Sequence, residues 1–160
     1  MINVIFVCMG NICRSPSGEA VMNSVIEKAG LENKIKCDSA GTIGFHAGES
    51  ADPRMIEYGS KRNYVLSSIA RKFHVSDFEK FDYIIAMDNK NLSDLLALDL
   101  AGKFTSKITK MTDHCTIIKV DEVPDPYYGG SQGFEHVLDI IEDGCNGLLK
   151  RIITVHPEMK

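Results

Sequence analysis

A cysteine and an arginine with five residues between them frame the part of this chain best suited to chemistry. Gly10 and Asn11, between Cys8 and Arg14, are the residue types that best tolerate a left-handed backbone. The free amides of a tight loop at a helix N-terminus bind anions, and a guanidinium matches two oxygens of a phosphate. The same groups stabilise a thiolate, which is a nucleophile. We therefore predict a phosphate site with Cys8 as nucleophile, formed by Cys8, Met9, Gly10, Asn11, Ile12, Cys13 and Arg14.

The spacing alone is weak evidence, since a chain with this many Cys and Arg residues is expected to contain such a pair by chance about 0.15 times. A buried structural cysteine and a surface arginine are the alternative. The flanking residues favour the site. The run 2–7 is nearly continuous apolar sequence, typical of a strand buried on both faces. Ser15 and Pro16 suit the cap and first turn of a helix.

The rest of the chain alternates strand and helix patterns. Such alternation predicts βαβ units and a parallel sheet covered by helices on both faces, with ligands bound beyond the carboxyl ends of the strands. The fourth strand is ambiguous between 107–111 and 116–120. We expect the other strands at 2–7, 35–39 and 83–87, and helices from Ser15 to Gly30, over 53–61, over 92–100 and over 134–152.

Composition limits the remaining possibilities. A length of 160 residues predicts a single domain over 1–160, and 44% hydrophobic with 25% charged residues is typical of a globular protein. No apolar stretch approaches the ~20 residues of a membrane span, and no signal peptide is visible. A net charge of −4 argues against nucleic-acid binding. Five cysteines without a CxxC pair favour a reduced, cytoplasmic protein without structural zinc.

Phosphate ester cleavage by a thiolate also needs an acid for the leaving group. Asp125 is the candidate, because Pro124 and Pro126 restrict the backbone on both sides of it. An Asp-Pro pair that simply begins a turn explains the same residues. The residues themselves leave both interpretations open.

The segment Val7–Pro16 resembles the signature loop of the low-molecular-weight protein tyrosine phosphatases. The similarity covers essentially the whole chain and continues through Asp38–Thr42, Phe81–Asp88 and Asp125–Gly129. It implies a Rossmann-like α/β fold, with a four-stranded twisted parallel sheet flanked by helices. It also favours 107–111 as the fourth strand.

This resemblance implies a cysteinyl-phosphate mechanism without a cofactor or metal. Cys8 attacks phosphorus, Arg14 holds the oxygens, and Asp125 is first general acid and then general base. The expected substrates are phosphotyrosine proteins or peptides and small aryl phosphates, and inorganic phosphate is the expected product inhibitor. The resemblance implies an acid phosphatase, and we expect a monomer with no membrane or nucleic-acid partner.

Supporting roles are also implied by the resemblance. Asn11 and Ser39 match a hydrogen-bonded pair that holds the loop, and the Ser15 hydroxyl faces the nucleophile. Phe45, Tyr127 and Tyr128 match an aromatic rim around the substrate, and both tyrosines match phosphorylation sites. Cys13 matches a cysteine that protects Cys8 from oxidation by a reversible disulfide. Two departures are Phe45, where Trp is frequent, and Ser68, where many members carry a His that contacts the Asp matching Asp88.

Three other functions fit the loop less well. Arsenate reduction needs further cysteines after the third strand, and 86–91 contains none. A phosphotyrosine-binding adaptor would lack the nucleophile or the acid, and both are present. A protein-arginine phosphatase has a smaller residue where this chain has Ile12.

Overall fold

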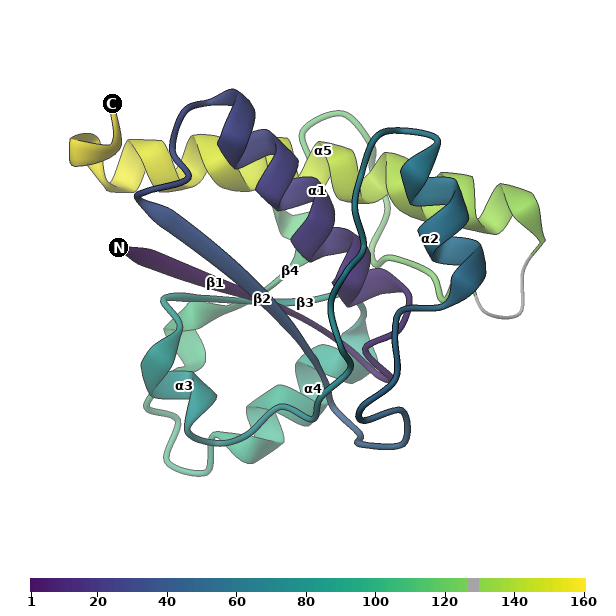
Figure 1. The fold of residues 1–160 in the computed structure, drawn as a ribbon. Coiled ribbons are helices and arrows are strands. Elements are labelled where there is room, and N and C mark those ends of the chain that lie inside the picture. Colours follow the sequence, from purple (N-terminus) through teal and green to yellow (C-terminus); the bar gives the residue numbers. More distant parts are fainter. Residues whose placement is uncertain (127–129) are drawn as a thin grey trace.

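Four parallel strands form one sheet in the order β2-β1-β3-β4 (Figure 1). The computed structural model describes residues 1–126 and 130–160. The strands are β1 (Ile2–Cys8), β2 (Ile35–Gly41), β3 (Tyr83–Ala86) and β4 (Ile108–Lys110). The parallel α/β fold predicted from the sequence is confirmed, and 108–110 is the fourth strand.

The central position of β1 follows from its residues. Val4 to Val7 are all fully buried, as expected of a strand covered on both faces. Val4 and Phe6 pack into the core below one set of helices, while Ile5 and Val7 pack into the core on the opposite face. A central strand with two apolar faces directs its carboxyl end, Cys8, to the edge where ligands bind in such sheets.

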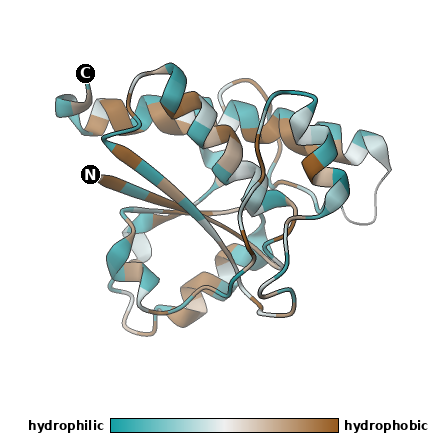
Figure 2. Cartoon of the chain, viewed as in Figure 1, coloured by the Kyte–Doolittle hydropathy of each residue, from teal (hydrophilic) through white to brown (hydrophobic). Residues whose placement is uncertain are grey.

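Helices cover both faces of the sheet (Figure 1). One layer contains α1 (Arg14–Lys28) and α5 (Ser131–Val155), which pack on each other, and α2 (Pro53–Ser60) lies against α5. The other layer contains α3 (Asp77–Lys80) and α4 (Asn89–Leu98). Hydrophobic and hydrophilic residues alternate along α5 in Figure 2, and its buried stripe runs from Phe134 to Ile152. Short 3-10 helices lie at Thr105–Lys107 (η1), Met111–His114 (η2) and Pro157–Met159 (η4).

The start of α1 differs from the sequence prediction. The helix begins at Arg14, so Cys13 is its N-cap residue and Ser15 is already inside the first turn. No side chain caps this end, because the Ser15 hydroxyl contacts Cys8 instead. The other end is as expected, since Gly30 follows the helix with a positive φ of 69°. Within the described residues, no helix is both long and apolar enough to cross a membrane.

Candidate active site

The loop between β1 and α1 lines a pocket of about 220 Å³ at the carboxyl edge of the sheet. Two segments distant in sequence, at 45–46 and 125, complete the wall of the pocket. The lining residues are Cys8, Met9, Gly10, Ile12, Cys13, Arg14, Phe45, His46 and Asp125. The nucleophile, arginine and acid predicted from the sequence therefore share one cavity.

Cys8 lies at the end of β1 with two hydrogen-bond donors around its sulfur. The Asn11 amide donates to Sγ at 3.3 Å, and the Ser15 Oγ lies 3.0 Å from Sγ. A thiolate only accepts hydrogen bonds, so the Ser15 hydroxyl donates when Cys8 is ionised. Both groups are therefore placed to donate to a thiolate, which is the nucleophilic form of a cysteine.

The backbone of the loop is arranged to receive an anion. Asn11 has a φ of 58°, the left-handed conformation predicted for it. Within residues 1–126 and 130–160, the amides of four loop residues have no hydrogen-bond acceptor, and these are Met9, Gly10, Ile12 and Cys13. Amide groups that line a pocket without a protein partner are the donors that an anion site requires.

Backbone contacts with neighbouring segments hold the outside of the loop. The amide of Thr42 donates to Cys8 O at 2.9 Å, and the amide of Ile43 donates to Met9 O at 3.1 Å. Gly41 is required at this close approach, because a Cβ there would lie 2.6 Å from Met9 O. The loop is therefore fixed by its carbonyl groups.

Arg14 is almost completely buried and makes three polar contacts. Its Nη1 donates to Asp88 Oδ2 at 2.6 Å and to Val123 O at 3.0 Å, and its Nη2 lies 3.7 Å from Asp125 Oδ2. Burial by itself lowers the pKa of Arg14, but the negative charges of Cys8, Asp88 and Asp125 outweigh burial and raise the pKa above its ordinary value. The guanidinium therefore stays cationic and is held in one orientation beside Cys8.

Asp125 reaches the pocket from the segment after η2. The Val123 amide donates to Met87 O at 2.8 Å and its carbonyl accepts from Arg14, so the backbone two residues before Asp125 is fixed. The carboxyl group of Asp125 is 35% exposed and lines the pocket. This position lets it exchange protons with both a bound molecule and water.

Sequence reasoning missed the role of Asp88. This residue caps α4 by accepting from the Asn91 amide at 2.7 Å, and its second carboxyl oxygen holds Arg14. The signal that could have identified it is its position two residues after β3, at the same sheet edge as Cys8. The Ser68 hydroxyl is buried without a hydrogen-bond partner in the described part of the chain. The contact that family members make through His is thus absent between Ser68 and Asp88.

The predicted pairing of Asn11 with Ser39 is wrong. The Asn11 side chain donates to Ser15 Oγ at 2.8 Å and accepts from the Arg71 amide at 3.0 Å. Ser15 lies four residues after Asn11, in the first turn of α1, and its hydroxyl oxygen accepts the hydrogen bond from the side-chain amide of Asn11. The Ser39 hydroxyl is buried close to the Glu19 carboxyl group instead.

The two cysteines of the loop have different surroundings. Cys13 also lines the pocket, but no hydrogen bond to its sulfur is found among the described residues. Burial raises its pKa far above the ordinary value, and the negative charge of Asp52 adds to the effect. Cys13 is therefore a neutral thiol at physiological pH, and Cys8 is the better placed nucleophile.

Phe45, predicted as part of an aromatic rim, lines the pocket together with His46. Phe45 is 81% exposed and its ring stands edge-on to the His46 ring, with centroids 4.8 Å apart. His46, which sequence analysis did not single out, is held by Glu49 at 2.6 Å. Tyr127 and Tyr128 lie outside the described residues. In the described ranges, no group of three or more His, Cys, Asp or Glu residues is arranged to hold a metal ion.

Comparison with known proteins places these features in a family. A model described as "Low molecular weight phosphotyrosine protein phosphatase" matches residues 3–156. A putative low molecular weight protein-tyrosine-phosphatase of Synechocystis is 51% identical over 91% of this chain and 93% of its own. A crystal structure of a protein tyrosine phosphatase from Entamoeba histolytica, with Hepes in its active site, superposes with a TM-score of 0.94 at 50% identity, covering 96% and 98% of the two chains. YfkJ from Bacillus subtilis gives a TM-score of 0.91 at 41% identity, covering 98% and 97%.

Proposed function

The chain belongs to the low molecular weight phosphotyrosine protein phosphatase family, and we propose that it hydrolyses phosphotyrosine and other aryl phosphate monoesters through a cysteinyl-phosphate. Membership of the family identifies the chain as a phosphatase. The residues that line the pocket support the cysteinyl-phosphate mechanism. One observation supports it most: the sulfur of Cys8 and the buried guanidinium of Arg14 line the same pocket as the Asp125 carboxyl group.

The first step transfers the phosphoryl group to the enzyme. The Cys8 thiolate forms a bond to phosphorus while the bond from phosphorus to the aryl oxygen breaks. Arg14 and the loop amides that lack an acceptor bind the remaining phosphate oxygens, where negative charge accumulates. Because Asp88 and Val123 already orient Arg14, little reorganisation is needed when the substrate binds.

Asp125 supplies the proton that the aryl oxygen takes up as it leaves. A phenolate is a poor leaving group, so protonation in the transition state accelerates its departure. The fixed backbone at Val123 supports this role, since it limits where the Asp125 carboxyl group can lie.

The second step regenerates the enzyme. Asp125, now ionised, removes a proton from water, the water oxygen bonds to phosphorus, and the sulfur–phosphorus bond breaks. The Ser15 hydroxyl, 3.0 Å from the sulfur, donates to the departing thiolate. The released phosphate occupies the same donors as the substrate, so inorganic phosphate inhibits.

The exposed ring of Phe45 supports a preference for aryl groups, and Tyr127 and Tyr128 are proposed as the rest of this rim. Cys8 is only 3% exposed, so a short seryl phosphate would have to enter the pocket with its peptide backbone. We propose a monomer that acts in a reducing compartment such as the cytoplasm, which fits five free cysteines.

Turnover of a phosphotyrosine peptide should be compared with that of the same peptide carrying phosphoserine. We expect hydrolysis of the first and at most a trace of the second, and no turnover of either by Cys8→Ser. Equal rates on both peptides would contradict the aryl preference. Activity retained by Cys8→Ser would contradict the covalent mechanism.

A further inference from the structure

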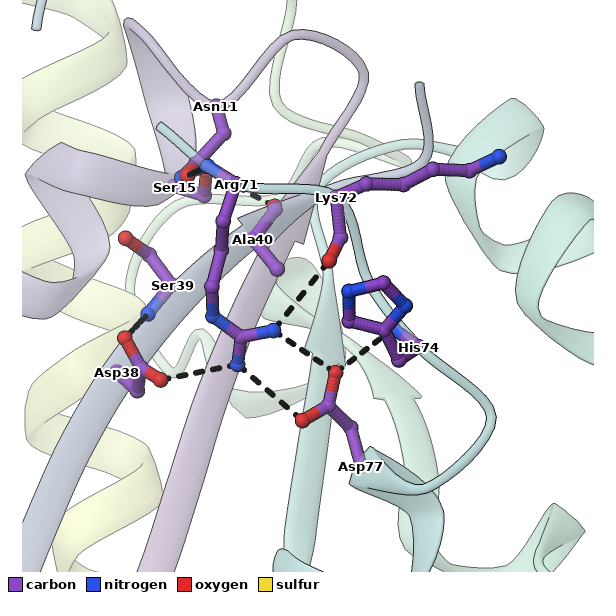
Figure 3. A network of polar contacts seen from close by, with 9 residues as sticks. All are labelled: Asn11, Ser15, Asp38, Ser39, Ala40, Arg71, Lys72, His74 and Asp77. Carbon is purple, nitrogen blue, oxygen red and sulfur yellow. Dashed lines mark hydrogen bonds and ion pairs between the residues drawn. The ribbon is translucent and has the colours of Figure 1, made fainter. Parts of the chain in front are cut away.

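Arg71 lies outside the pocket but is connected to it by a chain of hydrogen bonds (Figure 3). Its guanidinium bridges two carboxylates from different elements. Nη2 donates to Asp38 Oδ2 of β2 at 2.9 Å, and Nη1 donates to Asp77 Oδ2 of α3 at 2.9 Å. A second bond to Asp77 Oδ1 at 3.2 Å makes that contact bidentate. Such a planar, two-sided arrangement fixes an arginine more firmly than a single ion pair.

The backbone of Arg71 is the part that faces the active site. Its amide donates to Asn11 Oδ1 at 3.0 Å, and its carbonyl accepts from the Gly41 amide at 2.8 Å. Apart from isolated bridges at Ile69 and Lys72, the surrounding segment belongs to no strand or helix. The ion pairs of the side chain restrain this amide together with backbone hydrogen bonds of the neighbouring residues, from the Ala70 amide to Glu49 O and from the Phe73 amide to Gly41 O, both at 2.8 Å.

Asn11 carries the connection to the nucleophile. Its Nδ2 donates to Ser15 Oγ at 2.8 Å and its own amide donates to the Cys8 sulfur at 3.3 Å. Asn11 must keep a left-handed backbone, with φ at 58°, for the loop to close in this shape. A non-glycine residue in that conformation persists only when its surroundings restrain it. The Arg71 amide provides such a restraint by donating a hydrogen bond to the side-chain oxygen of Asn11.

We propose that Arg71 is a positioning residue for the phosphatase reaction. Its ion pairs with Asp38 and Asp77 fix its amide, which holds Asn11 and thereby the donors around the Cys8 sulfur. The inference rests on the proposed function of the same site. The competing explanation is that Arg71 only joins β2 to α3 and contributes stability.

A double-mutant cycle with Asn11 separates these two explanations. Arg71→Ala should lower kcat/KM for p-nitrophenyl phosphate on the order of tenfold to a hundredfold, the cost of a small misplacement of reacting groups. Asn11→Gly removes the side chain that links the two and tolerates the left-handed backbone. In the Asn11→Gly background, Arg71→Ala should change kcat/KM by less than about threefold, because coupled residues are not additive. An equal loss in both backgrounds would overturn the proposal.

A second arginine supplies the matched control. Arg62 also binds several carboxylates, those of Glu135, Asp139 and Glu142, but contacts no residue of the loop. Arg62→Ala should keep kcat/KM within about twofold of wild type, while a loss like that of Arg71→Ala would show a general stability effect. If Arg71→Ala does not fold, Asp38→Asn replaces it in the same cycle, since it removes one ion pair and leaves the arginine in place.

The dissociation constant of inorganic phosphate, measured by calorimetry, gives a readout that does not need turnover. It should rise with Arg71→Ala in the wild-type background and not in the Asn11→Gly background. If the wild-type protein binds phosphate but hydrolyses no aryl phosphate, the proposed function is refuted. The cycle measured in the phosphate dissociation constant then still tests whether Arg71 acts on the loop through Asn11. An unchanged phosphate dissociation constant in Arg71→Ala, with an unchanged kcat/KM, would refute the positioning role alone.

Discussion

Backbone amides converge in two regions of this molecule, and the two regions differ in whether the protein itself supplies the acceptor. In the segment that follows η2, the amides of 116–118 donate to the carboxylate of Asp143 in α5, at 3.1, 3.0 and 2.7 Å. In the loop after β1, the amides that line the pocket have no acceptor in the described part of the chain. The first region is closed by a side chain of the protein, whereas the second has donors left for a ligand.

This difference separates stability from activity. A carboxylate that accepts several amides stabilises the fold, since hydrogen bonds to a charged group contribute about 1.5–3 kcal/mol each. Amides without an acceptor contribute nothing of that kind, so the shape of the β1–α1 loop depends on the bonds to its carbonyl groups, on the close approach at Gly41 and on the side chain of Asn11. We therefore expect changes in the open region to act on turnover, and changes at Asp143 to act on unfolding.

The largest effect is expected from Cys8→Ser. Turnover of p-nitrophenyl phosphate should fall by several orders of magnitude, because a serine hydroxyl is not ionised at neutral pH. Inorganic phosphate should still bind, since Arg14 and the loop amides are unchanged. Steady-state kinetics and calorimetry measure the two quantities. Loss of both turnover and phosphate binding would mean that the change has collapsed the loop.

Arg14→Lys should be the next most severe. A lysine keeps the charge but cannot donate to Asp88 and Val123 while also presenting two donors to a phosphate. We expect kcat/KM to fall by about 10²–10³, the cost of losing an oriented donor. A loss below tenfold would show that charge alone suffices at this position.

Asp125→Asn should act selectively on poor leaving groups. Loss of a general acid costs about 10²–10⁴ in rate where protonation is needed. The loss should be greatest for phenyl phosphate and should shrink for phenols of low pKa, which leave without a proton. Rates across a series of substituted phenyl phosphates provide the measurement. An equal loss for every leaving group would exclude Asp125 as the acid.

Cys13→Ser should leave the basal rate nearly unchanged and alter recovery from peroxide. In the wild type, peroxide converts the Cys8 thiolate to a sulfenic acid, and the Cys13 thiol then displaces water to form a disulfide that a dithiol reduces. Without Cys13, further oxidation of Cys8 becomes irreversible. Activity after dithiol treatment and the mass of the peptide containing both cysteines test this. Equal recovery of variant and wild type would contradict the protective role.

Asp143→Asn should give the smallest effect on activity and a measurable one on stability. Burial raises the pKa of Asp143, but the amides of 116–118 outweigh burial and lower the pKa below its usual value. This stabilisation is present above the unfolded pKa of about 3.9 and is lost as the pH falls through the folded value. At neutral pH we expect a loss of about 1.5–3 kcal/mol in the free energy of unfolding, with kcat/KM unchanged.

The difference in Tm between wild type and Asp143→Asn should then narrow as the pH falls below about 4, because Asp143 of the unfolded wild-type chain takes up a proton there and the folded carboxylate does so only at lower pH. Thermal melts over a pH series give this directly. A constant difference at every pH would mean that the asparagine is destabilising for a reason other than its missing charge.

Local patterns in the sequence predicted more of this molecule than long-range contacts did. The buried run of β1 and the apolar stripe of α5 predicted both elements, because each pattern extends over many residues. The three residues of β4 and the four of α3 are too short for periodicity to identify. Within the site, the loop from Cys8 to Arg14 was predicted because it is contiguous.

The contacts that sequence reasoning missed join distant positions. The ion pair between Arg14 and Asp88 joins residues 74 positions apart in the sequence. The hydrogen bond from the Arg71 amide to Asn11 joins residues 60 positions apart. The periodicity of apolar residues along one sequence does not indicate which distant side chains meet. The cap predicted at Ser15 was wrong for a related reason: its hydroxyl is taken by the Cys8 sulfur, a tertiary contact that outweighs a local preference.

The central place of β1 in the sheet also bears on the order of folding. Cys8 and Ser15 are brought together by two adjacent elements, β1 and α1, whereas Asp125 is held at the pocket through β3 beside β1 and the bond from the Val123 amide to Met87 O. Contacts between positions this far apart in sequence close slowly, as the contact-order relation describes. We therefore expect turnover to return later during refolding than the characteristic reactivity of the Cys8 thiol.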